Sequence, residues 1–331
     1  MKAVVLVGGI GTRLRPLTLT TPKQMLPVAG RPMIERVVAH LAAHGVDEVI
    51  LSLGYRPDAF MAAYPDGRCA GVRLRYAVEP EPRDTAGGIA FAARQAGVDE
   101  TFLVQNGDVL TDMDIGELIA FHRQRGAAAT ISLIPVEDPS RYGVVAMDDR
   151  GQVTDFVEKP PLDLAPSNLI NAGTYVLEPS VLDHIAADRP VSIEREVFPA
   201  LVSEGSVYAL ASDARWIDAG TPDTYLRVNL AVADREQYWV HELAEVDAAA
   251  EVSESIIGAG AVVGAGARVQ GSLVMNGARV GAAATVRDSI VGSGATVGAG
   301  ALVEAMSVLG DDADLAPGAV ACGARLPATR P

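Results

Sequence analysis

The stretch Ala3-Val4-Val5-Leu6-Val7-Gly8-Gly9-Ile10-Gly11-Thr12-Arg13 decides how the first part of the chain folds. Its five consecutive apolar residues are typical of a strand that is buried on both faces. The glycines that follow allow backbone N–H groups to approach a bound anion without a Cβ in the way. Leu14 stands where a dinucleotide fingerprint has its last glycine, and no Gly-Lys-Ser/Thr of a P-loop follows. The stretch by itself therefore predicts only a buried strand and a glycine-rich turn.

Strand-like and helix-like segments alternate from this stretch to about residue 230. Strand patterns occupy residues 49–51, 72–78 and 101–105, and helical patterns occupy residues 34–43 and 85–96. This order predicts an α/β fold, with a Rossmann-like, mostly parallel sheet and helices on both faces. Ligands bind at the carboxyl ends of such strands. The loops 8–15 and 106–108 both follow strands at that edge.

A second pattern begins near residue 252. Valine recurs every 17 residues, at Val252, Val269, Val286, Val303 and Val320, and apolar residues within each unit step by five, six and six. Glycine, alanine and small polar residues fill the gaps. Such a short repeat predicts a parallel β-helix whose valines stack inside, and the hexapeptide-like step favours the left-handed, triangular form. In the fourth unit Leu315 takes the place expected at Asp314.

These patterns predict an α/β domain over residues 1–230, a linker over 231–250 and a left-handed β-helix over 251–331. The chain has 331 residues and a formal net charge of -15, which disfavours a nucleic-acid or anionic membrane partner. No apolar run approaches the ~20 residues of a membrane span, and the N-terminus lacks a signal h-region. Cys69 and Cys322 are too few for a disulfide framework. We expect a cytoplasmic protein.

Lysine is rare in this chain. Only Lys2, Lys23 and Lys159 stand among the 27 basic residues, and the others are arginines. Lysine is a compact point charge and arginine a planar fork, so lysines that remain in an arginine-rich chain are candidates for function. Lys23 and Arg13 are two cations near the glycine-rich turn, an arrangement that suits a triphosphate.

The stretch Gly8 to Thr18, followed by Pro22-Lys23, resembles the signature of the sugar-1-phosphate nucleotidylyltransferases, G-G-x-G-T-R-L-x-P-L-T and then P-K. The resemblance extends over the first ~230 residues, through residues 106–108, 157–160, 171–173 and 216–221. The chain most resembles the mannose-1-phosphate guanylyltransferase branch, to which residues 192–199 are also similar. A C-terminal β-helix is a common companion in this family.

The resemblance implies a reaction. An oxygen of a hexose 1-phosphate attacks the α-phosphorus of a nucleoside triphosphate, and pyrophosphate leaves. The nucleophile is already an anion, so alignment and charge neutralisation replace a general base. The expected substrates are GTP and mannose 1-phosphate, with GDP-mannose as product and Mg²⁺ as cofactor.

The resemblance also implies residue roles. Arg13, Lys23 and Asp108 are expected to be catalytic, and Asp108 and Asp218 to share the Mg²⁺. The expected nucleotide-binding residues are Leu6, Gly8, Gly9, Gly11, Thr12, Arg13, Lys23, Glu79, Ala86, Gly87 and Asp108. The expected sugar-phosphate-binding residues are Gly143, Glu158, Lys159, Asn171 and Gly173.

Arg83-Asp84 departs from the family pattern, which reads Leu-Gly there. The two charges either pair with each other or alter the choice of base or sugar. Glucose 1-phosphate or a cyclitol phosphate, with UTP, dTTP or another triphosphate, therefore stays an alternative.

A catalytically silent regulatory subunit is disfavoured, because the cations and the acids are present. Acyl transfer is disfavoured because all five histidines precede the β-helix. We expect the β-helix to serve homo-oligomer assembly or regulation, and its removal to affect these more than the chemistry.

Overall fold

The computed structural model describes residues 1–327, which fall into two compact units. The first unit contains residues 1–9 and 34–217. The second contains residues 10–33 together with the chain from Asp218 onward. The division predicted from the sequence, at 230 and 250, stays a prediction. The units differ from it in one respect that matters below: residues 10–33 join the C-terminal unit.

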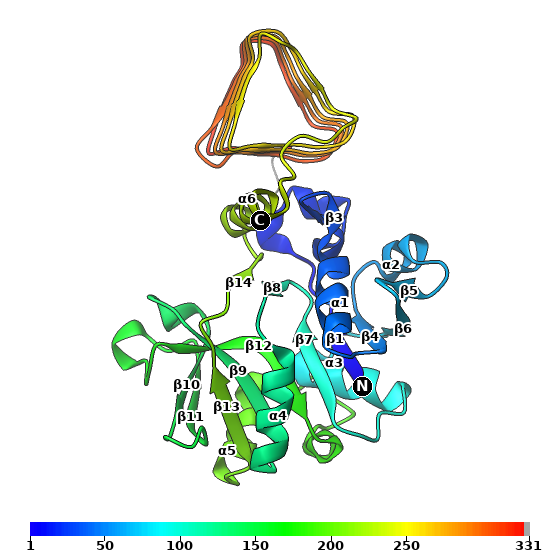
Figure 1. Cartoon of the computed structure of the whole chain (residues 1–331), viewed down its shortest axis with the longest axis vertical. Coiled ribbons are helices and arrows are strands. Elements are labelled where there is room, and N and C mark those ends of the chain that lie inside the picture. The colour runs from blue at the N-terminus through cyan, green and yellow to red at the C-terminus, as the bar shows by residue number, and fades with distance from the viewer. Residues whose placement is uncertain (328–331) are drawn as a thin grey trace. The chain divides into compact units, whose positions relative to one another are not determined.

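A mixed, Rossmann-like sheet forms the first unit (Figure 1). Strand β1 runs parallel to β4 and β7, and β4 runs parallel to β6, whereas β12 runs antiparallel to β7 and β9. The mostly parallel sheet is thus confirmed for the central strands. The strands in spatial order are β11 (Val153–Glu158), β10 (Gly143–Met147), β12 (Leu169–Leu177), β7 (Phe102–Asn106), β1 (Lys2–Leu6), β4 (Glu48–Leu53), β6 (Val72–Val78) and β5 (Arg68–Cys69), while β9 (Ala129–Pro135) joins β12 to β13 (Val207–Ala211).

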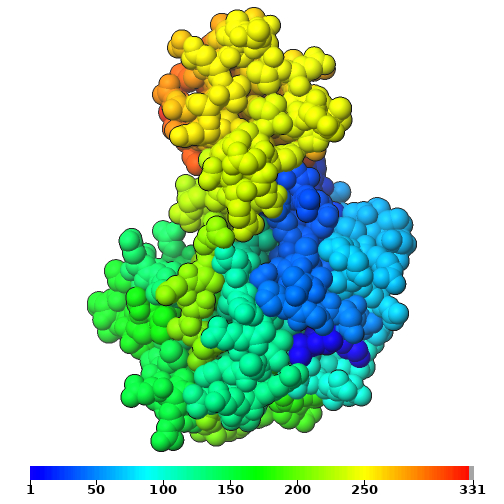
Figure 2. Space-filling model, viewed as in Figure 1, coloured from blue at the N-terminus to red at the C-terminus, as the bar shows by residue number. Residues whose placement is uncertain are grey.

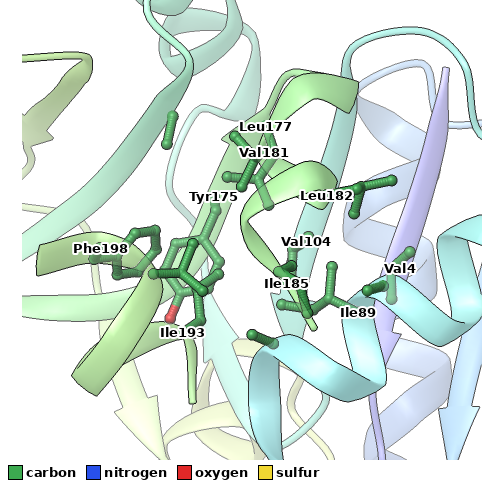
Figure 3. Packing of buried hydrophobic residues seen from close by; sticks show 14 of the residues in the cluster. Val4, Ile89, Val104, Tyr175, Leu177, Val181, Leu182, Ile185, Ile193 and Phe198 are labelled. Carbon is green, nitrogen blue, oxygen red and sulfur yellow. The ribbon is translucent and has the colours of Figure 1, made fainter. Parts of the chain in front are cut away.

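Apolar side chains of alternate strand residues build the core of this unit. Val4 and Val104 lie on the same face, and both cluster with Ile89 of helix α3 (Asp84–Gln95). Tyr175 packs edge-on against Phe198, with ring centroids 5.1 Å apart, and Figure 3 shows the two rings together. The helices predicted over 34–43 and 85–96 are confirmed. The first of these is α1 (Met33–Ala43) and the second is α3. The other α-helices of the unit are α2 (Pro57–Ala63), α4 (Ile115–Arg125) and α5 (Phe198–Ser203), and two short strands lie outside the sheet, β8 (Val109–Thr111) and β14 (Trp216–Asp218).

The C-terminal repeat folds into three parallel sheets whose coils form a triangle in Figure 1. The register follows the repeat, because Val252 lies beside Val269, and Val269 beside Val286. The parallel β-helix is confirmed, and its left-handedness stays a prediction. In Figure 2 the side of the β-helix that faces the viewer is mostly yellow, the colour of its first coils. The sheets contain β15 (Glu245–Val246), β18 (Val262–Val263), β21 (Arg279–Val280), β24 (Thr296–Val297) and β27 (Asp314–Leu315); β16 (Glu251–Ser253), β19 (Arg268–Gln270), β22 (Thr285–Arg287), β25 (Leu302–Glu304) and β28 (Val320–Cys322); β17 (Ile256–Ile257), β20 (Leu273–Val274), β23 (Ile290–Val291), β26 (Val308–Leu309) and β29 (Arg325–Leu326).

The fourth coil is one residue longer than the sequence pattern indicates. Ala305 and Met306 both adopt left-handed backbone (φ 57° each) at one corner, and beyond it the register is set by Val303 beside Ala321. Ala321 is 2% exposed and Val320 is 65% exposed. The expectation that Val320 continues the inward valine row is therefore wrong, because a one-residue slip turns a side chain to the opposite face. The expected inward position of Leu315 is confirmed.

The two cysteines differ in burial, which predicts different reactivity. Burial raises the pKa of the Cys69 thiol to about 11, and the Glu35 carboxylate adds to the shift. Cys322 is exposed. Because the thiolate is the nucleophile, an aryl disulfide reagent at pH 8 should titrate Cys322 rapidly and Cys69 only after unfolding. Cys322→Ser should remove the fast phase and Cys69→Ser should keep it. Two fast thiols in the folded protein would contradict this burial.

Candidate active site

Loops from four parallel strands gather at one edge of the sheet in the first unit. β1, β4, β6 and β7 point the same way, and Gly8, Gly54, Glu79 and Asp108 follow their carboxyl ends. Gly8 and Gly54 are in close contact, since a Cβ on Gly54 would lie 3.2 Å from the carbonyl oxygen of Gly8. The structure therefore brings residues 8–9 and 106–108 to the same sheet edge, where α/β proteins bind ligands.

The turn that carries Asp108 depends on glycine at the position before it. The N–H of Gly107 donates to the carbonyl oxygen of Leu6 (2.9 Å). A Cβ at Gly107 would lie 2.7 Å from Val7 Cγ1 and 2.8 Å from that same oxygen. Only glycine lets the chain cross β1 this closely and present the partly exposed Asp108. Gly107 was not among the expected site residues, although a glycine between two polar residues at a strand end was a signal for it.

Glu79 supports the loop that leads into α3. Its Oε1 accepts a hydrogen bond from Ser52 Oγ (2.7 Å), and its Oε2 accepts one from the backbone N–H of Arg83 (3.1 Å). A Cβ at Gly88 would lie 2.9 Å from Glu79 Oε1, so that glycine makes room for the carboxylate. Both oxygens of Glu79 are thus engaged within the protein. A direct contact of Glu79 with the nucleotide stays a prediction.

The charged pair that departs from the family pattern is split between two environments. The Arg83 guanidinium donates to the carbonyl oxygen of Ala187 (3.0 Å) and lies 5.0 Å above the Phe91 ring. Asp84 is exposed, has a left-handed backbone (φ 59°), and accepts a hydrogen bond from the N–H of Thr85 (2.7 Å). Of these two charges, Arg83 is therefore anchored to the chain around residue 187, and Asp84 faces the solvent.

Residues 191–194 hold the start of α3 in place. Thr85 Oγ1 donates to Glu194 Oε2 (2.7 Å) and accepts from the N–H of Ile193 (2.9 Å). The N–H groups of Ala86 and Gly87 both donate to the carbonyl oxygen of Val191, at 2.9 and 3.1 Å. This fixes the two α3 residues expected to contact the nucleotide. Glu194 was not an expected site residue, and the resemblance over residues 192–199 was its only signal.

The expected sugar-binding residues of β12 form a bonded group. Asn171 Oδ1 accepts from the N–H of Gly173 (2.9 Å), and Asn171 Nδ2 donates to the hydroxyl of Tyr175 (2.8 Å). Burial raises the pKa of Tyr175, and the Glu194 carboxylate adds to the shift, so the phenol remains protonated. Gly173 is left-handed (φ 76°), and a Cβ there would lie 2.5 Å from Asn106 Nδ2. Asn171 and Gly173 are thereby placed beside the 106–108 turn.

Gly143, Glu158 and Lys159 also lie together. Gly143 is the register partner of Glu158 across β10 and β11. Lys159 Nζ lies 2.6 Å from Glu158 Oε1, and the side chains are 56% and 16% exposed, respectively. Lys159 is therefore an exposed cation on a half-buried carboxylate. Because its ammonium group is largely exposed, Lys159 is accessible to an anionic ligand from the solvent.

A methyl group at position 143 should disturb this carboxylate. A Cβ there would lie 2.7 Å from Phe156 Cζ and 3.0 Å from Glu158 Oε2. We expect Gly143→Ala to raise the KM for the hexose 1-phosphate about 10-fold, with a smaller effect on the KM for the nucleotide. Steady-state kinetics with each substrate varied in turn checks this. Ala146→Gly, on the same strand, serves as the control; equal changes in both KM values would contradict the assignment.

The second unit carries the rest of the glycine-rich loop. Gly11 is left-handed (φ 68°), and a Cβ there would lie 3.0 Å from Thr18 Cγ2 and 3.2 Å from Lys23 Cβ. Thr18 Oγ1 donates to the carbonyl oxygen of Gly11 (2.7 Å). Gly11 thus has a conformational and a steric reason to be glycine. The structure brings Gly11 against the stem of Lys23, as the expected nucleotide site requires.

Two cations and one carboxylate meet around Gly220 in this unit. Lys23 is 5% exposed, and its Nζ lies 3.6 Å from Asp218 Oδ1. A Cβ on Gly220 would lie 2.8 Å both from Arg13 Nη2 and from Asp218 Oδ1. Arg13 and Lys23 are therefore brought together with Asp218, which is distant from both in the chain. A buried lysine and an arginine beside a glycine-rich turn can neutralise phosphate charge.

The acidic residues fit the donor requirements of Mg²⁺. Within residues 1–327, no three His, Cys, Asp or Glu side chains are placed to hold a metal ion among themselves. Mg²⁺ usually takes one or two carboxylates and completes its shell with substrate phosphates and water. Asp108 is partly exposed and the Asp218 side chain is 24% exposed. Each can therefore offer carboxylate oxygens of the kind that Mg²⁺ binds.

Comparison with known proteins agrees with this geometry. Residues 2–235 match the family model described as nucleotidyl transferase, and residues 235–328 match that of the GMPPB C-terminal domain. The chain is 40% identical over 291 residues to mannose-1-phosphate guanylyltransferase of Mycobacterium tuberculosis, covering 84% of this chain and 80% of that protein. It is 39% identical over 333 residues to probable mannose-1-phosphate guanylyltransferase 3 of Oryza sativa subsp. japonica, covering 94% and 91%.

A solved structure supports the same relationship. HddC from Yersinia pseudotuberculosis, complexed with GMP-PN, superposes with a TM-score of 0.60 and 29% identity, and covers 70% of this chain and 99% of its own. The family model spans most of the chain, and the two relatives align over most of their own length. The chain therefore belongs to the nucleotidyl transferase family, among the mannose-1-phosphate guanylyltransferases.

Proposed function

We propose that this protein transfers a guanylyl group from GTP to mannose 1-phosphate and forms GDP-mannose and pyrophosphate. The observation that carries the proposal is the meeting of Arg13 and the buried Lys23 beside the glycine-rich loop. The relatives named above, which are mannose-1-phosphate guanylyltransferases, support guanine as the base and mannose as the sugar. Glucose 1-phosphate with UTP or dTTP remains the second candidate, because Asp84 is an exposed charge where the family has glycine.

The chain's own groups account for the nucleotide half of the reaction. Gly8, Gly9 and Thr12 would direct N–H and hydroxyl groups at the triphosphate. Arg13 would neutralise the departing pyrophosphate, and Lys23 the α-phosphate. The ammonium of Lys23 lies 3.6 Å from the Asp218 carboxylate, so an α-phosphate would compete with that carboxylate for it. Charge neutralisation at fixed positions is the main contribution expected for phosphoryl and nucleotidyl transfer.

The sugar phosphate would be held by the first unit. Lys159 would leave Glu158 to bind the phosphate, and Glu158, freed from its ion pair, would accept hydrogen bonds from sugar hydroxyls. Asn171 and Gly173 would contact the hexose. The attacking oxygen needs no base, so these residues act by orientation.

Asp108 and Asp218 would hold Mg²⁺, which when bound supplies charge neutralisation at the phosphate oxygens. The metal, the cytoplasmic location and a homo-oligomer formed through the β-helix stay predictions. Among residues 1–327, no helix is long and apolar enough to cross a bilayer.

A substrate matrix tests the proposal. ATP, GTP, CTP, UTP and dTTP would each be incubated with mannose, glucose and galactose 1-phosphate and Mg²⁺, and pyrophosphate release measured. We expect the highest kcat/KM for GTP with mannose 1-phosphate. The highest value for UTP or dTTP with glucose 1-phosphate would favour the second candidate. If no pair of triphosphate and sugar phosphate gives pyrophosphate release, the protein would instead be a catalytically silent regulatory subunit.

A further inference from the structure

Residues 10–33, which contain Arg13 and Lys23, cluster with the β-helix rather than with the large sheet. Family resemblance alone places these residues in the catalytic domain. In the structure, contacts from the fourth β-helix coil and from helix α6 (Pro222–Glu236) hold the segment at both ends. The contacts are specific enough to assign individual residues.

The first contact is a steric one between Gly310 and Pro16. A Cβ on Gly310 would lie 2.9 Å from Pro16 Cβ and 3.1 Å from Pro16 Cγ. Gly292 occupies the equivalent position one coil earlier, and there the blocking atoms belong to the next coil, with Gly310 C at 2.6 Å. Gly310 is therefore a glycine chiefly because residue 16 packs on it. This corner of the β-helix is shaped to receive the cation-bearing segment.

The second contact is polar. Asp311 accepts a hydrogen bond from Thr20 Oγ1 through Oδ2, and one from the N–H of Ser293 (3.1 Å) through Oδ1. Ser293 belongs to the preceding coil. The carboxylate thus ties the segment to two successive coils at once. A hydrogen bond to a charged acceptor is stronger than one between neutral groups.

Buried contacts link the anchored residue Thr20 to the cation Lys23. Residues 17–19 form a single 3₁₀ turn in which Leu17 and Thr18 are 0% and 1% exposed. Thr18 Oγ1 donates to the Gly11 carbonyl oxygen (2.7 Å), and Gly11 packs against the stem of Lys23. Thr20, the partner of Asp311, is only two positions after Thr18, the donor of this hydrogen bond. A shift of Thr20 would therefore move Gly11 and the lysine stem.

Helix α6 fixes the other end of the segment. The N–H of Ala29 donates to the buried Asn229 Oδ1 (2.9 Å), and the Tyr225 hydroxyl donates to the Pro27 carbonyl oxygen. Gly30 is covered by the Tyr238 ring, since a Cβ there would lie 2.5 Å from the Tyr238 hydroxyl oxygen. The segment is consequently held near residues 27–30 by α6 and by Tyr238, which follows that helix, and near residues 16–20 by the β-helix.

We propose that Asp311 and Gly310 of the β-helix are positioning residues for the nucleotide, acting through Thr20 and Pro16 on the loop that carries Arg13 and Lys23. The inference rests on the proposed function, because it takes the triphosphate as the ligand of that loop. It gives the β-helix a part in nucleotide binding that is separate from assembly. It also predicts that removing the β-helix weakens nucleotide binding directly.

The test removes the Thr20 hydroxyl with little change in volume. For Thr20→Val we expect the KM for GTP, and the Kd for GTP by calorimetry, to rise about 5- to 10-fold. The KM for mannose 1-phosphate should change less than about 2-fold, because that ligand binds to the other unit. Thr20→Ser, which retains the hydroxyl, should restore GTP binding. A purely structural role would lower the Tm without separating the two KM values.

Asp311→Ala should reproduce the effect of Thr20→Val, and the double variant should be no worse than either single one. The matched control is Asp314→Ala, which removes an exposed carboxylate from the same coil. GTP affinity unchanged in Thr20→Val, or equal changes in both KM values, would overturn the inference. A wild-type protein that binds GTP but forms no GDP-mannose would instead overturn the proposed function. The Kd values for GTP of the wild type and the variants would still test whether Asp311 positions the nucleotide.

Discussion

Replacing Lys23 with alanine should lower kcat by about 1000-fold while the protein stays folded, because the variant loses a fixed charge at the α-phosphate. The lysine is 5% exposed and its ammonium lies 3.6 Å from the Asp218 carboxylate. Its loss leaves Asp218 close to an incoming triphosphate without that neutralising cation. Steady-state kinetics with GTP and mannose 1-phosphate, with circular dichroism to check the fold, measures this. A kcat within a few-fold of wild type would remove Lys23 from the reaction.

Lys23→Arg is a sharper test of the same site, since it keeps the charge. The side chain of Lys23 is 5% exposed and its Nζ already lies 3.6 Å from Asp218 Oδ1, so a longer side chain with a wider planar head fits poorly. We expect a loss of activity nearly as large as with alanine. Lys2→Arg is the matched control, because Lys2 donates to the carbonyl oxygen of Gly97 at an exposed position. A fully active Lys23→Arg would show that the site requires only charge.

Asp108→Asn should lower kcat by two to three orders of magnitude, that is about 100- to 1000-fold. The substitution keeps the shape of the side chain on the Gly107 turn but removes the anion expected to hold Mg²⁺. The Mg²⁺ concentration needed for half-maximal activity should rise as well. Kinetics across a range of Mg²⁺ concentrations separates the two effects.

The control for Asp108 lies four residues along the chain. Asp112 pairs with Arg215 (2.6 Å), and hydrogen bonds from Arg215 keep the Asp112 pKa below its usual value although burial opposes them. Asp112→Asn therefore removes a carboxylate that pairs with an arginine within the protein, and it should leave the Mg²⁺ requirement unchanged. If Asp108→Asn keeps both its turnover and its Mg²⁺ dependence, Asp108 does not hold the metal.

Much of the fold could be predicted from the sequence, because its signals are local. The strand at Ala3–Val7 is an uninterrupted apolar run, and the β-helix repeats at a fixed spacing. The register of the last coil could not be predicted, since the extra residue at Ala305-Met306 leaves Val320 at the expected spacing from Val303. Only the paired strands show that Ala321 takes the inward place.

Some residues of the candidate site could be predicted from the sequence, and others could be found only in the structure. Arg13, Lys23 and Asp218 were predicted from motifs, and the structure brings them together. Gly107 and Glu194 were missed as site residues because their roles depend on contacts with Leu6 and Thr85, distant in sequence. The anchorage of Thr20 by Asp311 has no motif at all. It arises from two segments 291 residues apart that meet only in the folded chain.

Transfer of an isotope label tests the central claim most directly. Mannose 1-phosphate carrying ¹⁸O in its three terminal phosphate oxygens would be mixed with GTP, Mg²⁺ and the wild-type protein, and the products followed by ³¹P NMR. If the sugar phosphate attacks the α-phosphorus, GDP-mannose should form with one ¹⁸O in the bridge to the guanosine phosphate, and the pyrophosphate should be unlabelled. Absence of GDP-mannose, or label in the pyrophosphate, would contradict the reaction proposed for this site.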